Sequence, residues 1–341
     1  MKFKKERVLF IIFVLILPIF LVFQTKKLII TNPQKENSKT ISQISSKESE
    51  VQTFSPFSGM PCINFSKRPF AIVISQELQS FPIFGISEAD LVIEMPYANP
   101  KGVTRLLVFF QCKEPQRIEP IRSLRPYMVD LAKGFDAILV SWGACEEAYK
   151  RALSLKVDWL SPVLYVKGSE AFFRDPNRQA PHNSYTSISS LKNVVQKLKI
   201  REENKFEGYL FKKALEKNEM PYVSQVDVDA YFYKVSWRFD PEKKVYFRYF
   251  NEKEVIDALN NNQIFARNLI LMKTQIGTLV PGVANIKVIG EGEARIYRGG
   301  QMIEGKWKKE AQDKKLTFLD KEGKEISFLP GPIWIEIVDS F

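Results

Sequence analysis

The chain has 341 residues, of which 45% are hydrophobic and 26% charged, and its formal net charge at pH 7 is +11. This charge would suit a nucleic-acid-binding protein, but the first 50 residues hold nine basic and four acidic residues, so the remaining body carries only +6. Basic and acidic residues alternate there, which is typical of a solvated surface, and we expect no nucleic-acid partner. One histidine in the whole chain argues against an ordinary zinc site, and we expect no metal.

The N-terminus predicts a membrane anchor. Residues 8–25 are uncharged and include VLFIIFVLILPIFLVF, which as a helix spans about 27 Å, close to the hydrocarbon thickness of a bilayer. The stretch lacks the small residues of a cleavage site, and the first cysteine, Cys62, comes too late for lipid attachment. Basic residues within 1–7 place that tail in the cytoplasm. We therefore predict a single-pass protein of the cell membrane with its body outside the cytoplasm.

A linker and an α/β domain follow. Residues 26–55 are rich in Ser, Thr, Asn, Gln and Lys, which predicts a flexible tether. Over 56–205, short apolar runs alternate with helical patterns, which indicates an α/β domain. The predicted strands are 69–75, 90–95, 102–112, 136–142 and 163–168. The predicted helices are 125–133, 145–155 and 188–199, the last with candidate serine caps.

A second, β-rich α+β domain is predicted over 220–341. Aromatic runs flank a turn at 240–244, and the pairs Gly299–Gly300 and Glu322–Gly323 suit tight hairpin turns because glycine accepts positive φ angles. One helix is predicted over 252–260 and a final strand over 333–338. The predicted fold is thus an α/β domain followed by a β-rich α+β domain, behind one N-terminal transmembrane helix.

Three arginines suggest an anion site. Arg105, Arg122 and Arg125 lie in one polar segment among apolar strands. Pro126 suits a first helical turn, which places Ser123 and Arg125 at a helix N-terminus, where backbone N–H groups and the helix dipole favour anions. Arginines there could bind a phosphate or carboxylate through paired hydrogen bonds. The alternative is that they form ion pairs with nearby carboxylates: Asp90, Glu94, Glu119 and Asp130.

The long polar segment 172–187 contains His182, Arg178 and Asn183. Segments of this kind are often functional, and a histidine with an ordinary pKa near 6.5 can act as a general acid or base. We name His182 as the candidate catalytic residue and the other two as candidate ligand-binding residues. The alternatives are that His182 only bonds to loop backbone groups and that Asn183 forms an Asx turn.

Other catalytic arrangements have weaker support. Cys62, Cys112 and Cys145 have no paired spacing, so the sequence leaves open whether any two form a disulfide. Cys145 could act with His182, although no nucleophile signature surrounds it. Glu94 with Asp130 could serve glycoside hydrolysis, but ion pairing explains both equally well. Because no Walker loop or G-x-G-x-x-G motif is present, we expect no cofactor.

Several motifs in a fixed order resemble the YerB-like family, bacterial proteins described as lipoproteins whose function is unknown. They include SPFSGMP (55–61), GISEADLVIE (85–94), GVTRLLVFFQ (102–111), IEPIRSLRPYMVDLA (118–132), RQAPHNSYTS (178–187) and GEGEARIYRGGQMIEGKWKK (290–309). The resemblance implies an envelope location and a two-domain body, and it brings no catalytic residues. This chain departs from the family in lacking a lipid-attachment cysteine, and in carrying Cys145 where such proteins have small or polar residues.

Three functions remain open. The leading hypothesis is a membrane-anchored protein, held by residues 8–25, that binds an anionic or polar envelope component through Arg105, Arg122, Arg125, Arg178 and His182. The second is an envelope enzyme acting on a phosphorylated or glycan substrate, with His182 as proton carrier. The third is a structural protein that docks another envelope protein through an exposed edge strand.

Overall fold

The computed structural model describes residues 53–98, 102–163, 167–213 and 222–341. The predicted tail 1–7, the anchor 8–25 and most of the linker 26–55 lie outside these residues. Within the described ranges, no helix is long and apolar enough to cross a membrane.

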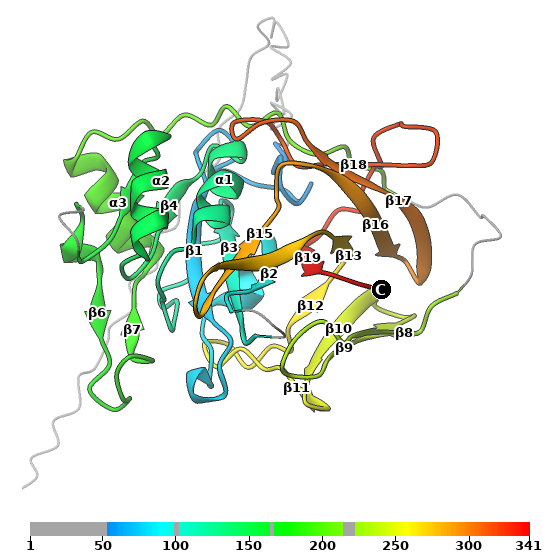
Figure 1. Cartoon of the computed structure of the whole chain (residues 1–341), viewed down its shortest axis with the longest axis horizontal. Helices are drawn as coiled ribbons and strands as arrows, with labels where there is room; N and C mark the ends of the chain where they lie inside the picture. Colours follow the sequence, from blue (N-terminus) through cyan, green and yellow to red (C-terminus); the bar gives the residue numbers. More distant parts are fainter. Residues whose placement is uncertain (1–52, 99–101, 164–166, 214–221) are drawn as a thin grey trace, which may run out of the picture. The chain divides into compact units, whose positions relative to one another are not determined.

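A ten-stranded mixed sheet forms the centre of residues 51–341 (Figure 1). Its strands are, in order across the sheet, β18 (Thr317–Leu319), β17 (Gln301–Lys309), β16 (Gly290–Arg298), β13 (Asn268–Lys273), β19 (Ile333–Val338), β2 (Leu91–Pro96), β3 (Thr104–Phe110), β1 (Phe70–Ser75), β4 (Ile138–Val140) and β5 (Trp159–Leu160). All six residues of β1, β2 and β19 are buried, as expected for strands covered on both faces.

One strand joins the two halves of the sequence. β19 lies between β13 and β2 and runs parallel to both, with Ile335 opposite Ile270 on one side and Ile93 on the other. The two predicted domains therefore contribute strands to a single sheet.

Helices and short strands cover one face of this sheet. These are α1 (Pro126–Gly134), α2 (Glu146–Ser154) and the hairpin of β14 (Ile276–Val280) and β15 (Val283–Ile286). Side chains of α1 and β15 share one apolar core with alternate residues of the central strands, for example Val73 and Leu107. Figure 1 shows α1 and β15 in front of the strands β1, β2 and β3.

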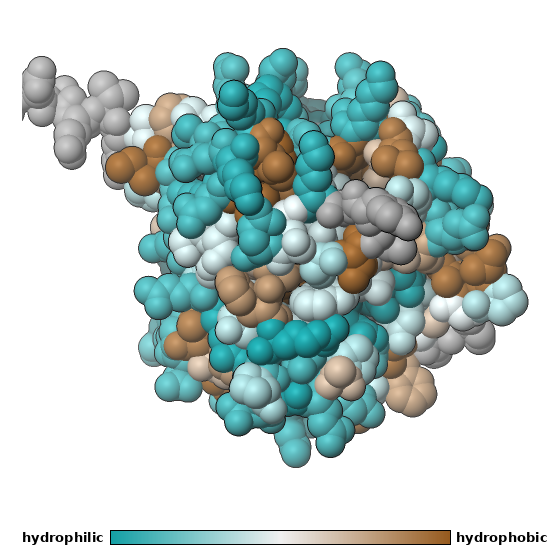
Figure 2. Space-filling model, turned by 90° about the vertical axis from the view of Figure 1, so that its left-hand side faces the viewer, coloured by the Kyte–Doolittle hydropathy of each residue, from teal (hydrophilic) through white to brown (hydrophobic). Residues whose placement is uncertain are grey.

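The other face packs against α3 (Ile188–Lys197) and a smaller sheet. That sheet consists of β8 (Gln225–Val228), β9 (Val235–Asp240), β10 (Val245–Phe250), β11 (Lys253–Glu254) and β12 (Phe265–Ala266). The remaining elements are the pair β6 (Phe173–Arg174) and β7 (Ser184–Tyr185) and the 3-10 turns η1 (Leu78–Ser80), η2 (Ile86–Glu88) and η3 (Ser169–Ala171). Figure 2 shows the side that lies to the left in Figure 1, where hydrophobic residues occur in small separate groups among hydrophilic ones.

A buried ionic cluster joins the two sheets. Arg248 of β10 and Glu94 of β2 are fully buried and form an ion pair with an N–O distance of 2.6 Å. Glu336 of β19, opposite Glu94 in register, accepts hydrogen bonds from Trp237 and Tyr231 at 2.9 Å each. Burial, followed by the charge of Glu94, raises the pKa of Glu336 well above its ordinary value, which favours the neutral form of Glu336.

Several predicted elements are confirmed. The three N-terminal helices occur with bounds shifted by two residues or fewer, and Ser187 caps α3 by accepting the backbone N–H of Ser190 at 3.1 Å. The hairpin of β9 and β10 and that of β16 and β17 form as predicted, the latter around Gly299 and Gly300. The strand predicted over 163–168 falls partly outside the described residues, and β5 lies just before it.

The predicted helix over 252–260 is wrong. The segment instead forms β11 and a turn, and the described residues 222–341 contain no α-helix, so the predicted α+β character of this half is also wrong. The reason is tertiary: Asp257 is fully buried and accepts the backbone N–H groups of Gly85, Ser87 and Leu259 at 2.8 to 2.9 Å. These contacts fix a turn, which local helical periodicity cannot reveal.

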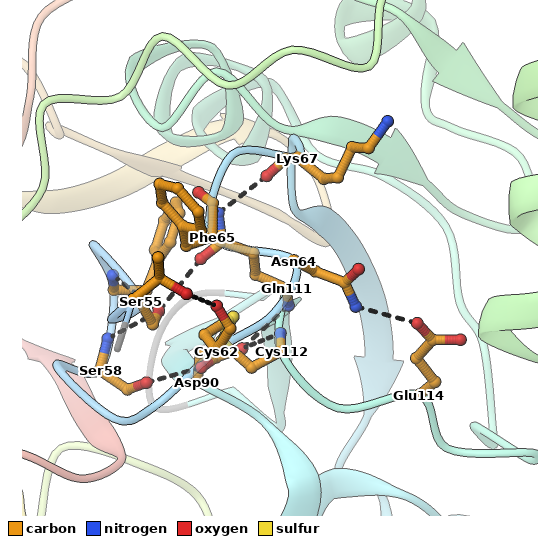
Figure 3. The surroundings of a disulfide bond; sticks show 12 residues. Ser55, Ser58, Cys62, Asn64, Phe65, Lys67, Asp90, Gln111, Cys112 and Glu114 are labelled. Carbon is orange, nitrogen blue, oxygen red and sulfur yellow. Dashed lines mark hydrogen bonds between the residues drawn. A yellow bond between two sulfur atoms is a disulfide. The ribbon is translucent and has the colours of Figure 1, made fainter. Parts of the chain in front are cut away.

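A disulfide links Cys62 to Cys112, which settles the pairing that the sequence left open and leaves Cys145 as a free thiol. Figure 3 shows the polar network around it. The Asp90 carboxylate accepts hydrogen bonds from the hydroxyl of Ser58 and from the backbone of Gln111 and Cys112. The disulfide and this network attach residues 53–67 to β2 and β3.

Candidate functional site

The candidate site lies where β1 and β2 end and α1 begins. Arg105 is near the start of β3, directly opposite Ser75, the last residue of β1. Arg125 is the N-cap residue of α1, followed by Pro126 in the first turn as predicted. We call the group formed by Arg105, Arg122 and Arg125 with Glu77, Tyr97 and His182 the arginine site.

Arg105 and Arg125 converge on one aromatic ring. The guanidinium carbon of Arg105 lies 4.2 Å from the centre of the Tyr97 ring, and that of Arg125 lies 5.5 Å from it. Arg105 is 3% exposed and Arg125 is 8% exposed. Each donates to a backbone carbonyl, that of Ser123 for Arg105 and that of Leu124 for Arg125, while both Nε atoms have no hydrogen-bond partner among the described residues.

Burial and the neighbouring cations both disfavour the charged form of Arg105. Burial, followed by the charges of Arg125 and Arg122, lowers the pKa of Arg105 from 12.5 to about 9. No carboxylate of the described residues comes within ion-pairing distance of Arg105 or Arg125. By contrast, the similarly buried Arg68 and Arg248 each contact a carboxylate.

Glu77 connects the arginines to the histidine. Its carboxylate lies 3.3 Å from Nη2 of Arg122 and accepts a hydrogen bond from the Tyr97 hydroxyl at 3.3 Å. Its other oxygen lies 3.6 Å from Nε2 of His182, whose Nδ1 is 3.0 Å from the hydroxyl of Ser80. Burial, followed by the charge of Arg122, lowers the pKa of His182 below 6.5, so the ring is neutral at pH 7.

A pocket of about 780 Å³ opens beside Glu77 and His182. Its other walls are formed by the charged side chains of Asp175 and Arg178 and by uncharged residues: Gln79, Phe81, Pro82, Phe84, Gln179, Ala180 and Pro181. Because Glu77 and His182 also belong to the arginine site, the pocket lies next to the Arg122 end of that site.

The carboxylates that could have neutralised the three arginines are engaged elsewhere. Glu94 pairs with Arg248, and Asp130 pairs with Arg151 at 2.8 Å. Glu119 pairs with Arg117 and Arg178, and Asp90 belongs to the network beside the disulfide. Among the three arginines, the alternative of ion pairing with a carboxylate therefore holds only for Arg122, which pairs with Glu77.

The other predicted site residues have different surroundings. Arg178 lies 3.0 Å from Glu119 and donates to the backbone carbonyls of Ser80 and Pro82, so it holds the η1 loop. Asn183 accepts a hydrogen bond from Arg174 and donates to the backbone of Asp175, which gives it an ordinary role within its loop. Ser123 contributes its backbone carbonyl to Arg105.

The structure does not bring together the residues of two other catalytic arrangements. Cys145 is the N-cap residue of α2, and its backbone N–H donates to Leu124, whereas the hydrogen bond and ion contact of His182 go to Ser80 and Glu77. Glu94 and Asp130 each form their own ion pair and do not form a carboxylate pair.

Sequence reasoning missed Glu77 and Tyr97. Each lies just after the carboxyl end of a strand, Glu77 two residues beyond β1 and Tyr97 immediately after β2. In open α/β sheets, ligands tend to bind at the carboxyl ends of strands, and this rule could have identified both residues.

Comparisons with known proteins agree with one another. Residues 57–201 match the N-terminal domain, and residues 225–335 the C-terminal domain, of a family described as "Protein of unknown function (DUF3048)". The chain is 29% identical over 278 residues to a Bacillus subtilis (strain 168) protein named "Putative lipoprotein YerB", covering 80% of this chain and 81% of that protein. The crystal structure of Bacillus subtilis YerB superposes with a TM-score of 0.74 and 27% identity, covering 85% of this chain and 97% of that one.

Proposed function

The chain belongs to the YerB-like family of proteins of unknown function (DUF3048), and from this premise we propose that it is a membrane-attached extracytoplasmic protein that binds an anionic group at the arginine site. One observation carries the proposal. Arg105 and Arg125 are buried side by side without a carboxylate among the described residues. Burying uncompensated charge costs several kcal/mol, and such costly arrangements are concentrated at functional sites.

The surroundings of the arginines suit an anion. Guanidinium groups bind phosphate and carboxylate oxygens through paired hydrogen bonds, and the unpartnered Nε atoms of Arg105 and Arg125 are donors without acceptors. The first turn of α1, which begins beside Arg125, adds the positive end of a helix dipole. Tyr97 lies against both guanidinium groups, so we expect its ring to move when an anion enters.

Three features support the location. The Bacillus subtilis relative is named as a lipoprotein. The uncharged stretch 8–25 would supply a single-pass anchor in place of a lipid. The disulfide between Cys62 and Cys112 is of a kind that forms and persists outside the cytoplasm.

The test is anion binding by the full-length chain in a non-ionic detergent, followed by the thermal unfolding temperature. Sulfate, phenyl phosphate and acetate serve as probes, because a ligand at a hundred times its dissociation constant adds about 2.7 kcal/mol to stability. We expect stabilisation of the wild type and its loss in Arg122→Gln. The matched control is Arg238→Gln, which removes the same charge from an exposed arginine paired with Glu252. Absence of stabilisation by every probe would contradict the proposal.

One observation favours a second candidate, an enzyme acting on the bound group. His182 and Glu77 line the pocket next to Arg122, where a neutral histidine could accept a proton. His182→Ala separates the two functions. If the protein only binds, the variant retains anion affinity at pH 7. If it is an enzyme, the variant binds but loses turnover of a substrate that the wild type converts.

A further inference from the structure

The charge balance of the arginine site limits what can bind there. Arg105, Arg122 and Arg125 bring three positive charges, and Glu77 brings one negative charge. His182 adds none at pH 7 because burial and Arg122 lower its pKa. The site therefore carries an excess of two positive charges within the part of the chain that the structure describes.

We propose that the ligand of this site is a phosphate monoester that binds as the dianion, with the phosphate among the three arginines and its organic group in the neighbouring pocket. The proposal rests on the function proposed above and names its ligand class. A dianion cancels the excess charge of the site, whereas a carboxylate cancels only half of it. A phosphate also offers three acceptor oxygens, which suits several guanidinium donors better than two carboxylate oxygens do.

The pocket is the reason to propose a phosphate ester rather than free phosphate as the ligand. It meets the arginine site at Glu77 and His182, and Glu77 is the residue that contacts Arg122. Beyond them its walls include the rings of Phe81 and Phe84 and the amide of Gln179. The lining also includes the oppositely charged Asp175 and Arg178, so these walls suit a small organic group with apolar and polar parts, and a volume of about 780 Å³ is in the range of sites for small organic molecules.

Other groups near the phosphate position could also titrate, so the test must separate them from the ligand. They are Glu77, His182, Tyr97, Tyr127 and, on the pocket side, Arg178 with Glu119 and Asp175. Burial raises the pKa of both tyrosines, so neither loses its proton near neutral pH. His182 gains charge on acidification, which would strengthen the binding of any anion at low pH.

Sulfate removes this ambiguity because it is a dianion throughout the range in which a phosphate monoester changes charge. The experiment measures dissociation constants of the full-length chain in detergent for phenyl phosphate, sulfate and acetate at pH 5 and pH 7.5 and constant ionic strength. With a second pKa near 6, roughly a tenth of a phosphate monoester is dianionic at pH 5 and nearly all of it at pH 7.5. We expect the affinity for phenyl phosphate, divided by that for sulfate, to rise about tenfold between the two pH values.

The pocket is tested by Gln179→Trp, which places a large side chain in an exposed position of its wall. We expect it to weaken phenyl phosphate by tenfold or more and to leave sulfate unchanged. The control Arg238→Gln should change neither ligand.

The outcomes separate the two proposals. A pH-independent ratio of phenyl phosphate to sulfate, or tighter binding of acetate than of both, overturns the dianion inference while the anion site itself stands. Equal weakening of phenyl phosphate and sulfate in Gln179→Trp, or no weakening of either, overturns the placement of the organic group. Binding of none of the three anions overturns the proposed function and this inference together.

Discussion

Removal of the disulfide between Cys62 and Cys112 should destabilise the protein strongly. The change is the double variant Cys62→Ala/Cys112→Ala, in which alanine adds no new polar group at either site. The bond closes a loop with a sequence separation of 50 residues, which includes β1, β2 and β3. Without it the unfolded chain gains conformational freedom that the native structure does not.

The size of the effect follows from the loop length. The loop-entropy relation gives about 14 cal/mol/K for 50 residues, or about 4 kcal/mol at 25 °C. The native contacts beside the bond survive the substitution, since Asp90 still accepts from Ser58 and from the backbone of residues 111 and 112. We therefore expect the loss to come mainly from the unfolded state.

The assay is urea unfolding of the full-length chain in detergent, followed by tryptophan fluorescence, because Trp237 and Trp307 are fully buried. Wild-type protein with a reductant should unfold at the same urea concentration as the double variant. Cys145→Ala is the control, since this thiol is free and should leave the transition almost unchanged. A loss below about 1 kcal/mol in the double variant, or an equal loss in Cys145→Ala, would refute the reasoning.

Three further predictions concern the buried groups. Because the pKa of Glu336 is raised, its carboxyl group loses the proton above pH 4.5 in the unfolded chain and keeps it in the folded chain. The stability of Glu336→Gln relative to the wild type should therefore increase between pH 4 and pH 8. Urea unfolding that gives the same difference in unfolding free energy at both pH values would contradict this. Burial lowers the pKa of Lys309 to about 8, so the unfolded chain binds more protons between pH 8 and 10.5 and wild-type stability should rise there by up to about 3 kcal/mol. Lys309→Met should abolish that rise, and its persistence would exclude Lys309 as the source. Gly300 has a φ of +80°, and an added Cβ would lie 2.8 Å from the Phe239 ring. Gly300→Ala should therefore lower the unfolding free energy by at least about 1 kcal/mol. Unchanged stability would show that the turn relaxes.

The predictable part of the fold is the part determined by neighbouring residues. Apolar runs identified β1, β2, β3 and β19, and Pro126 identified the start of α1. The segment 252–260 failed because its conformation depends on Asp257, whose partners Gly85 and Ser87 lie about 170 residues away. The sheet shared by both halves was missed for the same reason, since no local pattern records that β19 pairs with β2.

The site shows the same division. Arg105, Arg122 and Arg125 lie in one polar segment among apolar strands, so a shared site could be predicted. Their lack of carboxylate partners could not, because it depends on where Glu94 and Asp130 find Arg248 and Arg151. Likewise, no spacing rule pairs Cys62 with Cys112 across 50 residues.

The position of β19 also bears on the order in which the protein is made. β2 begins at Leu91 and β19 at Ile333, yet β19 occupies the middle of the sheet, between β2 and β13. During synthesis, β2 and β13 each have an open hydrogen-bonding edge until the polypeptide has reached Val338. A chain interrupted shortly before this point would hold nearly all of its core residues and still present two unpaired edges, which are sites for aggregation and proteolysis. The central strand thereby makes the lasting survival of the protein depend on completed translation.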